Sequence, residues 1–200
     1  RQDGPLWQIR LVLDQDSGPN YHTIMTIKDL DAAIRRVPDF PQQGIRFYDI
    51  TSVLANPRAF AFCVDQLTSI VRDSRCEAIA AIEARGFVFA SAIAYRLGIP
   101  LILVRKKGKL PNVCRSQSFD LEYGSDTICV QELDLVPGRR VHLIDDLIAT
   151  GGTLKAACEL FEGAGLVVAG ISAVIGLPFL GYPAALAPRP IHSLVNYDSE

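Results

Sequence analysis

The stretch that decides the fold lies in the second half of the chain, where the sequence reads Leu143-Ile144-Asp145-Asp146-Leu147-Ile148-Ala149-Thr150-Gly151-Gly152-Thr153. An apolar run leads into two adjacent carboxylates, and a loop of small residues with two hydroxyls then opens a predicted helix. Backbone N–H groups at a helix start bind phosphate, and glycine lets the backbone approach it closely. The stretch therefore predicts a strand, a phosphate-binding loop and a helix.

The carboxylates and the loop suit different parts of a sugar phosphate. The N–H groups of Ala149, Thr150, Gly151, Gly152 and Thr153 are predicted to hold the phosphate, with the two threonine hydroxyls as further donors. Asp145 and Asp146 repel a phosphate but suit sugar hydroxyls. A plainer interpretation stays open, in which Asp146 only caps the helix and the glycines only make a tight turn.

Strand and helix patterns alternate around this stretch. Continuous apolar runs with β-branched residues predict strands over 78–82, 100–104, 127–130, 141–144 and 166–175. Apolar residues at helical spacing predict helices over 27–36, 57–73, 86–97 and 152–161. The order predicts an α/β fold, a mainly parallel sheet between helices, whose ligands bind beyond the carboxyl ends of the strands.

Composition excludes several classes of function. The 200 residues fit one domain, and a net charge of −2 gives no field for holding nucleic acid or an anionic membrane. The five cysteines are an odd number without a C-x-x-C pair, which argues against a disulfide framework or a zinc site and favours the reducing cytoplasm. His142 is interpreted as a core residue.

Two basic features remain ambiguous from the residues alone. Arg85 follows a predicted strand and precedes a helix, so it fits either an anion site or a surface ion pair. The segment 105–118 is polar and basic and lacks periodicity, which predicts a long mobile loop. That loop is either a solvated surface or part of a functional site.

Five further stretches add a resemblance that spans residues 27–197. They are Pro38-Asp39-Phe40-Pro41, Gly44-Ile45-Arg46-Phe47-Tyr48-Asp49-Ile50, Glu83-Ala84-Arg85-Gly86-Phe87, Arg105-Lys106-Lys107-Gly108-Lys109-Leu110-Pro111 and Leu121-Glu122-Tyr123-Gly124. With residues 145–153, they resemble the type I phosphoribosyltransferase family and in particular its adenine-specific branch. This implies a central, mainly parallel sheet flanked by helices, an N-terminal hood and a mobile catalytic loop.

The resemblance also implies a function and an organisation. The expected reaction moves the 5-phosphoribosyl group of phosphoribosyl pyrophosphate (PRPP) to adenine and yields AMP and pyrophosphate, a step of purine salvage. Mg²⁺ is expected, held mainly by substrate oxygens and water without dedicated protein ligands. A homodimer is expected, with an extension over residues 1–26, a base-binding hood over 27–60 and a core over 61–200 in one domain.

The resemblance assigns the pyrophosphate and catalytic roles as well. Pyrophosphate ligands are Glu83, Ala84, Arg85, Arg105, Lys106 and Lys109. The Glu83–Ala84 peptide is expected to be cis, and residues 106–122 are expected to close as a lid. The catalytic residues are Glu122, near N7 of the base, Tyr123, over the closed site, and Arg85.

Adenine is expected between Phe47 and Leu147, with the backbone of Arg46 and Tyr48 reading its C6 edge. Two departures from the family bear on this site, since arginine is usual at Tyr48 and Asp-Ser is common at Glu83-Ala84. Two rivals stay open, namely an enzyme for hypoxanthine or xanthine, and a regulator that binds PRPP without turnover.

Overall fold

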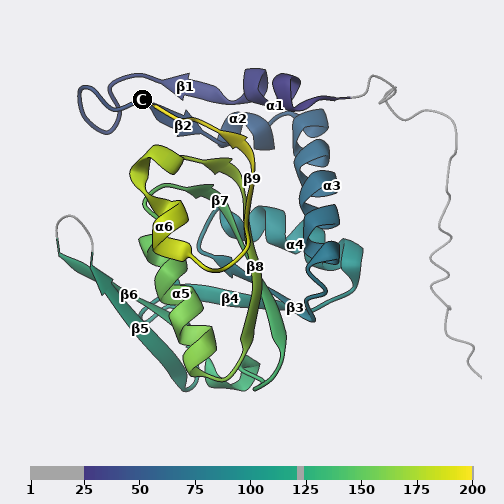
Figure 1. Cartoon of the computed structure of the whole chain (residues 1–200), viewed down its shortest axis with the longest axis vertical. Coiled ribbons are helices and arrows are strands. Elements are labelled where there is room, and N and C mark those ends of the chain that lie inside the picture. The colour runs from purple at the N-terminus through teal and green to yellow at the C-terminus, as the bar shows by residue number, and fades with distance from the viewer. Residues whose placement is uncertain (1–24, 121–123, 200) are drawn as a thin grey trace, which may run out of the picture.

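The computed structural model describes residues 25–120 and 124–199, and within them seven strands form one mixed sheet (Figure 1). The strands are β3 (Ala78–Ile82), β4 (Leu101–Lys106), β5 (Cys114–Asp120), β6 (Ser125–Gln131), β7 (Arg140–Ile148), β8 (Val167–Gly176) and β9 (Ile191–Asn196). Their order is β5-β6-β4-β3-β7-β8-β9. From β4 to β9 neighbouring strands run parallel, whereas β6 is antiparallel to both β4 and β5. The predicted α/β fold is confirmed.

Helices cover both faces of the sheet. Helices α3 (Pro57–Asp73) and α4 (Gly86–Leu97) share one apolar cluster with Ile79 and Ile144. Helices α5 (Gly152–Gly163) and α6 (Tyr182–Leu186) share a second cluster with Leu143 and Ile171. Every residue of β3 is buried, which explains why its sequence is an unbroken apolar run.

The hood lies above one end of the sheet, at the top of Figure 1. It comprises α1 (Ile27–Ala33), β1 (Arg35–Val37), β2 (Phe47–Asp49) and α2 (Thr51–Leu54). The predicted helix over 27–36 is too long, because Arg35–Val37 pairs antiparallel with β2 in a two-stranded sheet. The apolar residues keep their helical spacing through β1, so the sequence pattern does not show the end of α1. The end is set by pairing with β2, ten or more positions further along the chain.

The basic segment 105–118 also differs from its prediction as a loop. Strand β4 extends to Lys106, and β5 pairs with β6 over its whole length. This two-stranded arm leaves the body of the molecule at the lower left of Figure 1. Strand β5 has too few apolar residues to be predicted as a strand, because it contains the exposed polar residues Arg115, Ser116 and Ser118.

Strand β7 is longer than predicted, because it continues through both aspartates to Ile148. The helices predicted over 57–73 and 86–97 agree with α3 and α4. His142 is a core residue as predicted, since it is 1% exposed and its Nε2 lies 2.8 Å from the Ser172 hydroxyl. Strand β9 and helix α6 were not predicted.

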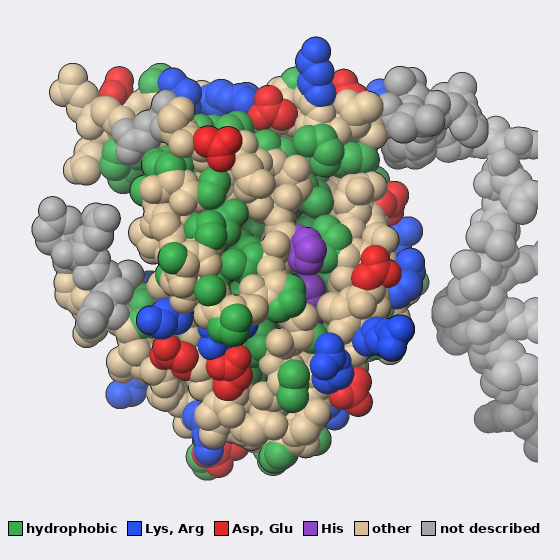
Figure 2. Space-filling model, in the orientation of Figure 1, with side chains coloured by type: hydrophobic (Ala, Val, Ile, Leu, Met, Phe, Trp, Pro, Cys, Tyr) green, Lys and Arg blue, Asp and Glu red, His purple; other side chains and the backbone are tan. Residues whose placement is uncertain are grey.

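Positively and negatively charged side chains are interspersed on the surface. In Figure 2, Lys and Arg side chains lie beside Asp and Glu around the rim of the visible face, with hydrophobic side chains between them. Among the helices that the structure describes, none is long and apolar enough to cross a membrane.

Candidate active site

The predicted phosphate loop lies at the start of α5. Gly151 caps this helix in the left-handed conformation, with φ +81°. A Cβ on Gly151 would lie 3.1 Å from Tyr182 Cβ and 3.2 Å from Leu186 Cγ, so a side chain would crowd α6 as well as strain the left-handed backbone. Residues 147–154 and Asp145 line a small cavity of about 120 Å³ at this helix N-terminus. The loop therefore lines a cavity at a helix N-terminus, where the first N–H groups have no partner within the helix and suit a phosphate.

A second cavity of about 330 Å³ adjoins the first and shares Asp145, Leu147 and Thr153 with it. Three elements supply much of its wall. These are the turn after β3, the end of β4 and the arm, which contribute Glu83, Ala84, Arg85, Lys106, Phe119 and Asp126. The shared residues make the two cavities one continuous site at the carboxyl ends of β3, β4 and β7.

The two aspartates at the end of β7 differ in their surroundings. Asp146 is 4% exposed and accepts from Arg85 Nε, with 2.5 Å between Nε and Oδ2. This hydrogen bond raises the pKa of Arg85. Burial, and then the Asp146 carboxylate beside it, raise the pKa of Asp145 well above its usual range. The Asp146 N–H donates to Asp145 Oδ1 at 2.8 Å, so the backbone fixes both groups relative to each other.

Glu83 organises the basic end of β4. Its Oε2 accepts from Arg105 Nε at 2.9 Å, and its Oε1 accepts from the Lys106 N–H at 2.5 Å. Burial acts to raise the pKa of Glu83, but these hydrogen bonds and the nearby cations outweigh it and lower the pKa. The Glu83–Ala84 peptide is cis, as the resemblance implied.

The start of α4 packs directly against β7. A Cβ on Gly86 would lie 2.9 Å from the Ile144 carbonyl oxygen and 3.1 Å from Asp145 Oδ1. Glycine at this position brings the turn with Arg85 against the two aspartates. Of the other predicted pyrophosphate ligands, Lys109 lies on the turn after β4, where its carbonyl oxygen accepts from Arg105 Nη1 at 3.0 Å.

The predicted adenine residues fall into two groups. Leu147 lines both cavities. Arg46, Phe47 and Tyr48 do not line either cavity: Arg46 is exposed, Phe47 packs edge-on against Phe40, and Tyr48 is buried in the hood. The pKa of Asp49, at the end of β2, is lowered first by the Thr51 hydroxyl and further by Arg35 and Arg85.

Two predicted catalytic residues, Glu122 and Tyr123, lie outside the described residues. The sequence analysis missed several cavity residues, and two of them, Phe119 and Asp126, lie on the arm. They face each other across the arm, and Asp126 pairs with Lys106 at 2.8 Å. Phe119 comes just after the segment 105–118 that was predicted as a loop, and Asp126 comes just before the predicted strand over 127–130. Only the β5–β6 pairing could have indicated them.

Metal ligands do not cluster in the described parts of the chain. Over residues 25–120 and 124–199, there is no group of three His, Cys, Asp or Glu side chains that could hold an ion together. The cavity wall nevertheless offers carboxylate oxygens at Asp145 and Asp146, the ligand type that Mg²⁺ prefers. An ion held chiefly by a substrate and water fits this wall.

Comparison with known proteins agrees with this geometry. A family model described as the phosphoribosyl transferase domain matches residues 49–182. A Treponema denticola protein named adenine phosphoribosyltransferase is 55% identical over 177 residues, which are 88% of this chain and 93% of that protein. The chain belongs to the adenine phosphoribosyltransferase family. A relative of the same name from Chloroflexus aurantiacus is 44% identical over 173 residues, covering 86% of this chain and all of that protein.

Solved structures of adenine phosphoribosyltransferases have the same fold. The enzyme from Thermoanaerobacter pseudethanolicus superposes with a TM-score of 0.83 at 40% identity, covering 86% of this chain and 100% of that one. The Saccharomyces cerevisiae enzyme, complexed with adenine and D-2,5-dideoxy-2,5-imino-altritol 1,6-bisphosphate, gives a TM-score of 0.80 at 32% identity, covering 84% and 98%. The predicted type I phosphoribosyltransferase fold is therefore confirmed.

Proposed function

We propose that this chain transfers the 5-phosphoribosyl group of PRPP to adenine and releases AMP and pyrophosphate. The observation that carries the proposal is the pair of adjoining cavities that share Asp145, Leu147 and Thr153. One cavity lies at a helix start suited to a phosphate, and the other is lined by cations suited to a pyrophosphate. The family's name and the adenine complex of the yeast relative support adenine as the base.

The 5′-phosphate binds the N–H groups of residues 149–153. The left-handed Gly151 turns the loop so that successive N–H groups face the same small cavity. Thr150 and Thr153 add hydroxyl donors. Asp145 and Asp146, at the end of β7, accept hydrogen bonds from the ribose hydroxyls, and their fixed geometry orients the sugar ring.

Pyrophosphate binds in the larger cavity, which Arg85 and Lys106 line and to which Glu83 and Ala84 contribute the turn. Arg105, paired with Glu83, adds a further cation, and Lys109 closes over the site from the next loop. Arg85, Arg105 and Lys106 are each paired with an acid: Asp146, Glu83 and Asp126 respectively. These pairs hold the cations in place without substrate. A pyrophosphate carries several negative charges and competes for the guanidinium and ammonium donors that remain exposed.

Adenine binds between Phe47 and Leu147, and the backbone of Arg46 and Tyr48 reads its C6 edge. Phe47 lies on the opposite side of β2 from Tyr48, because side chains alternate along a strand. The Tyr48 side chain is buried in the hood, so it stays out of the base site. Base choice then depends on the backbone, and tyrosine in place of arginine leaves adenine preferred.

In the reaction, N9 of adenine attacks C1 of the ribosyl group, and the bond from C1 to the pyrophosphate oxygen breaks with its electron pair on pyrophosphate. Arg85, Arg105, Lys106 and Lys109 stabilise the charge that develops on the leaving group. Glu122 accepts the proton that N7 of adenine loses as N9 bonds to C1, and Tyr123 packs over the closed site and helps to exclude water. Asp145 and Asp146 would offer carboxylate oxygens to a Mg²⁺ ion, which would supply positive charge to neutralise the leaving group.

We extend the proposal to organisation and location. Residues 27–60 act as the base-binding hood, residues 61–200 as the core, and residues 1–26 as an extension. We propose a homodimer, as the family resemblance implies. All five cysteines are unpaired thiols, which supports the reducing cytoplasm.

Measurement of pyrophosphate release from PRPP and Mg²⁺, with and without adenine, tests the proposal. We expect release that requires adenine and equals the AMP formed. Release without a base, or binding of PRPP without release in the presence of any purine, would contradict it and favour the regulator. The Arg96→Gln variant, altered at the far end of α4, is a control for surface charge.

A further inference from the structure

The hood is tied to the C-terminal end of the chain by two stacked tyrosines. The rings of Tyr48 on β2 and Tyr197 after β9 are nearly parallel, with centroids 3.9 Å apart and an interplanar angle of 7°. Tyr48 is only 5% exposed, although it belongs to a two-stranded ribbon outside the main sheet. Stacked aromatic rings stabilise an interface beyond the area that they bury.

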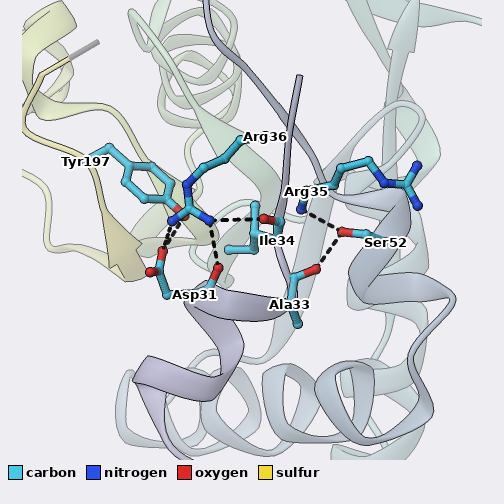
Figure 3. Close-up of polar contacts among 7 residues, drawn as sticks. All are labelled: Asp31, Ala33, Ile34, Arg35, Arg36, Ser52 and Tyr197. Carbon is cyan, nitrogen blue, oxygen red and sulfur yellow. Dashed lines mark hydrogen bonds and ion pairs between the residues drawn. The ribbon is translucent and has the colours of Figure 1, made fainter. Parts of the chain in front are cut away.

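Tyr197 is held from several sides. Its hydroxyl donates to Asp31 Oδ1 at 2.7 Å, and the Arg36 guanidinium lies 5.4 Å from the centre of its ring (Figure 3). Arg36 also contacts Asp31 Oδ1 at 2.6 Å through Nη2. The Tyr197 N–H donates to the Gly176 carbonyl oxygen at 3.0 Å. The ring is thus fixed both to the hood and to the end of β8.

These contacts connect the base-reading strand to the phosphoribosyl loop. Arg36 and Tyr48 are directly opposite each other in the hood ribbon, and both contact Tyr197. Gly176, which anchors Tyr197, is the partner of Ile148 in the main sheet. Ile148 immediately precedes the phosphate loop. A short path of contacts therefore runs from β2 through the two tyrosines to the strand with Asp145 and Asp146.

We propose that Tyr48 and Tyr197 are positioning residues, whose stack sets the place of the base-reading strand β2 over the phosphoribosyl site. The inference rests on the proposed function, since it assumes that β2 reads the base. Neither ring needs to touch substrate. Loss of the stack lets β2 shift, which weakens contacts with the base and spares those with the phosphate.

Four variants separate ring stacking from the other contacts. Tyr48→Phe keeps the stack, Tyr48→Leu removes it, Tyr197→Phe keeps the stack but loses the hydrogen bond to Asp31, and Tyr197→Leu removes both. The readout is the affinity for AMP and for ribose 5-phosphate, measured by calorimetry, because the two ligands differ only in the base. KM for adenine and for PRPP gives the same comparison during turnover.

We expect Tyr48→Leu and Tyr197→Leu each to lower the affinity for AMP about three- to tenfold, the loss expected when an aromatic pair is removed. Ribose 5-phosphate affinity and the KM for PRPP should stay within about twofold. Tyr48→Phe should match the parent. The double leucine variant should bind AMP no more weakly than the Tyr197→Leu variant, because the two substitutions break the same contact.

Two results would overturn the proposal, because each would show that the stack only stabilises the fold. The first is an equal loss of affinity for AMP and for ribose 5-phosphate. The second is an unchanged affinity for AMP in both leucine variants together with a lower melting temperature. If the parent binds IMP or GMP better than AMP, the adenine assignment fails instead. The same variants then decide the role of the stack with the preferred nucleotide. If a leucine variant does not fold, the methionine variant at the same position replaces it, because methionine also removes the ring stack.

Discussion

Arg85 and Asp146 join the two halves of the site, because Arg85 Nε donates to Asp146 Oδ2 at 2.5 Å across 61 residues of sequence. The Asp146 side chain is 5% exposed and that of Arg85 is 53% exposed. The buried acid therefore fixes one edge of the guanidinium, while the rest of this planar group faces the cavity. A residue of the proposed sugar site thus orients a cation of the proposed pyrophosphate site.

The first prediction concerns this cation. Arg85→Gln should raise the KM for PRPP about 10- to 100-fold, the loss expected for a charged hydrogen bond. The KM for adenine should change far less, because Arg85 is assigned to the pyrophosphate and not to the base. Initial rates at varied PRPP and adenine check this, with Arg96→Gln on the same helix as the control. Equal increases for both substrates would indicate a folding defect.

The second prediction concerns Asp145, whose pKa burial raises well above its usual range. The ionised carboxylate is less favourable in the folded chain than in the unfolded one, so stability falls as pH rises from about 4 towards the folded pKa. Asp145→Asn should therefore increase the free energy of unfolding at pH 7 by more than the roughly 0.5 kcal/mol typical of surface changes. Activity should fall at the same time.

Urea unfolding of parent and Asp145→Asn at pH 4.5 and pH 7 checks this dependence. The difference between the two proteins should shrink at the lower pH. Asp65→Asn is a suitable control, since Asp65 lies on the exposed side of α3 and pairs with Arg96. A variant less stable than the parent at pH 7 would refute the stated role of burial.

The third prediction concerns the phosphate loop. Gly151→Ala should destabilise the protein by about 1–2 kcal/mol, because a left-handed backbone disfavours a side chain and the side chain would crowd α6. The PRPP affinity should fall with it. Gly163→Ala, at the other end of α5, places its Cβ in open space and should change stability by less than about 1 kcal/mol. If both variants change the PRPP affinity to a similar extent, the loop does not bind the phosphate.

The fourth prediction concerns Glu122. Glu122→Gln should lower kcat by about 10²- to 10⁴-fold, the usual cost of a lost general acid or base, with little change in either KM. Single-turnover rates separate the chemical step from product release. Glu132→Gln, an exposed residue beyond the arm, serves as the control. If Glu122→Gln reacts within a few-fold of the parent, the residue acts only in closing the site.

Local sequence predicted the parts of the fold whose signals are local. Asn56 and Pro57 mark the start of α3, and Asn56 Oδ1 accepts from the N–H groups of Arg58 and Ala59 as a cap should. The unbroken apolar run of β3 and the glycine-opened helix α5 were found for similar reasons. Asp145 to Thr153 could be identified as a site because one short stretch holds all its groups.

The missed parts depend on contacts between distant residues. The strand β1 is defined by its pairing with β2, and β5 by its pairing with β6. Lys106 meets Asp126 twenty residues away, and Tyr197 meets Asp31 across 166 residues. The cis Glu83–Ala84 peptide was expected only through the family resemblance, since no local pattern indicates it.

A competition assay tests the central claim most directly. Equal concentrations of adenine and hypoxanthine compete for limiting PRPP, and the AMP and IMP formed are separated and counted. A site that pairs with the amino group of adenine rejects the oxo group by leaving polar groups unpaired, so we predict an excess of AMP that can reach about 10⁴-fold. An excess of IMP would contradict the assignment of adenine while leaving phosphoribosyl transfer intact.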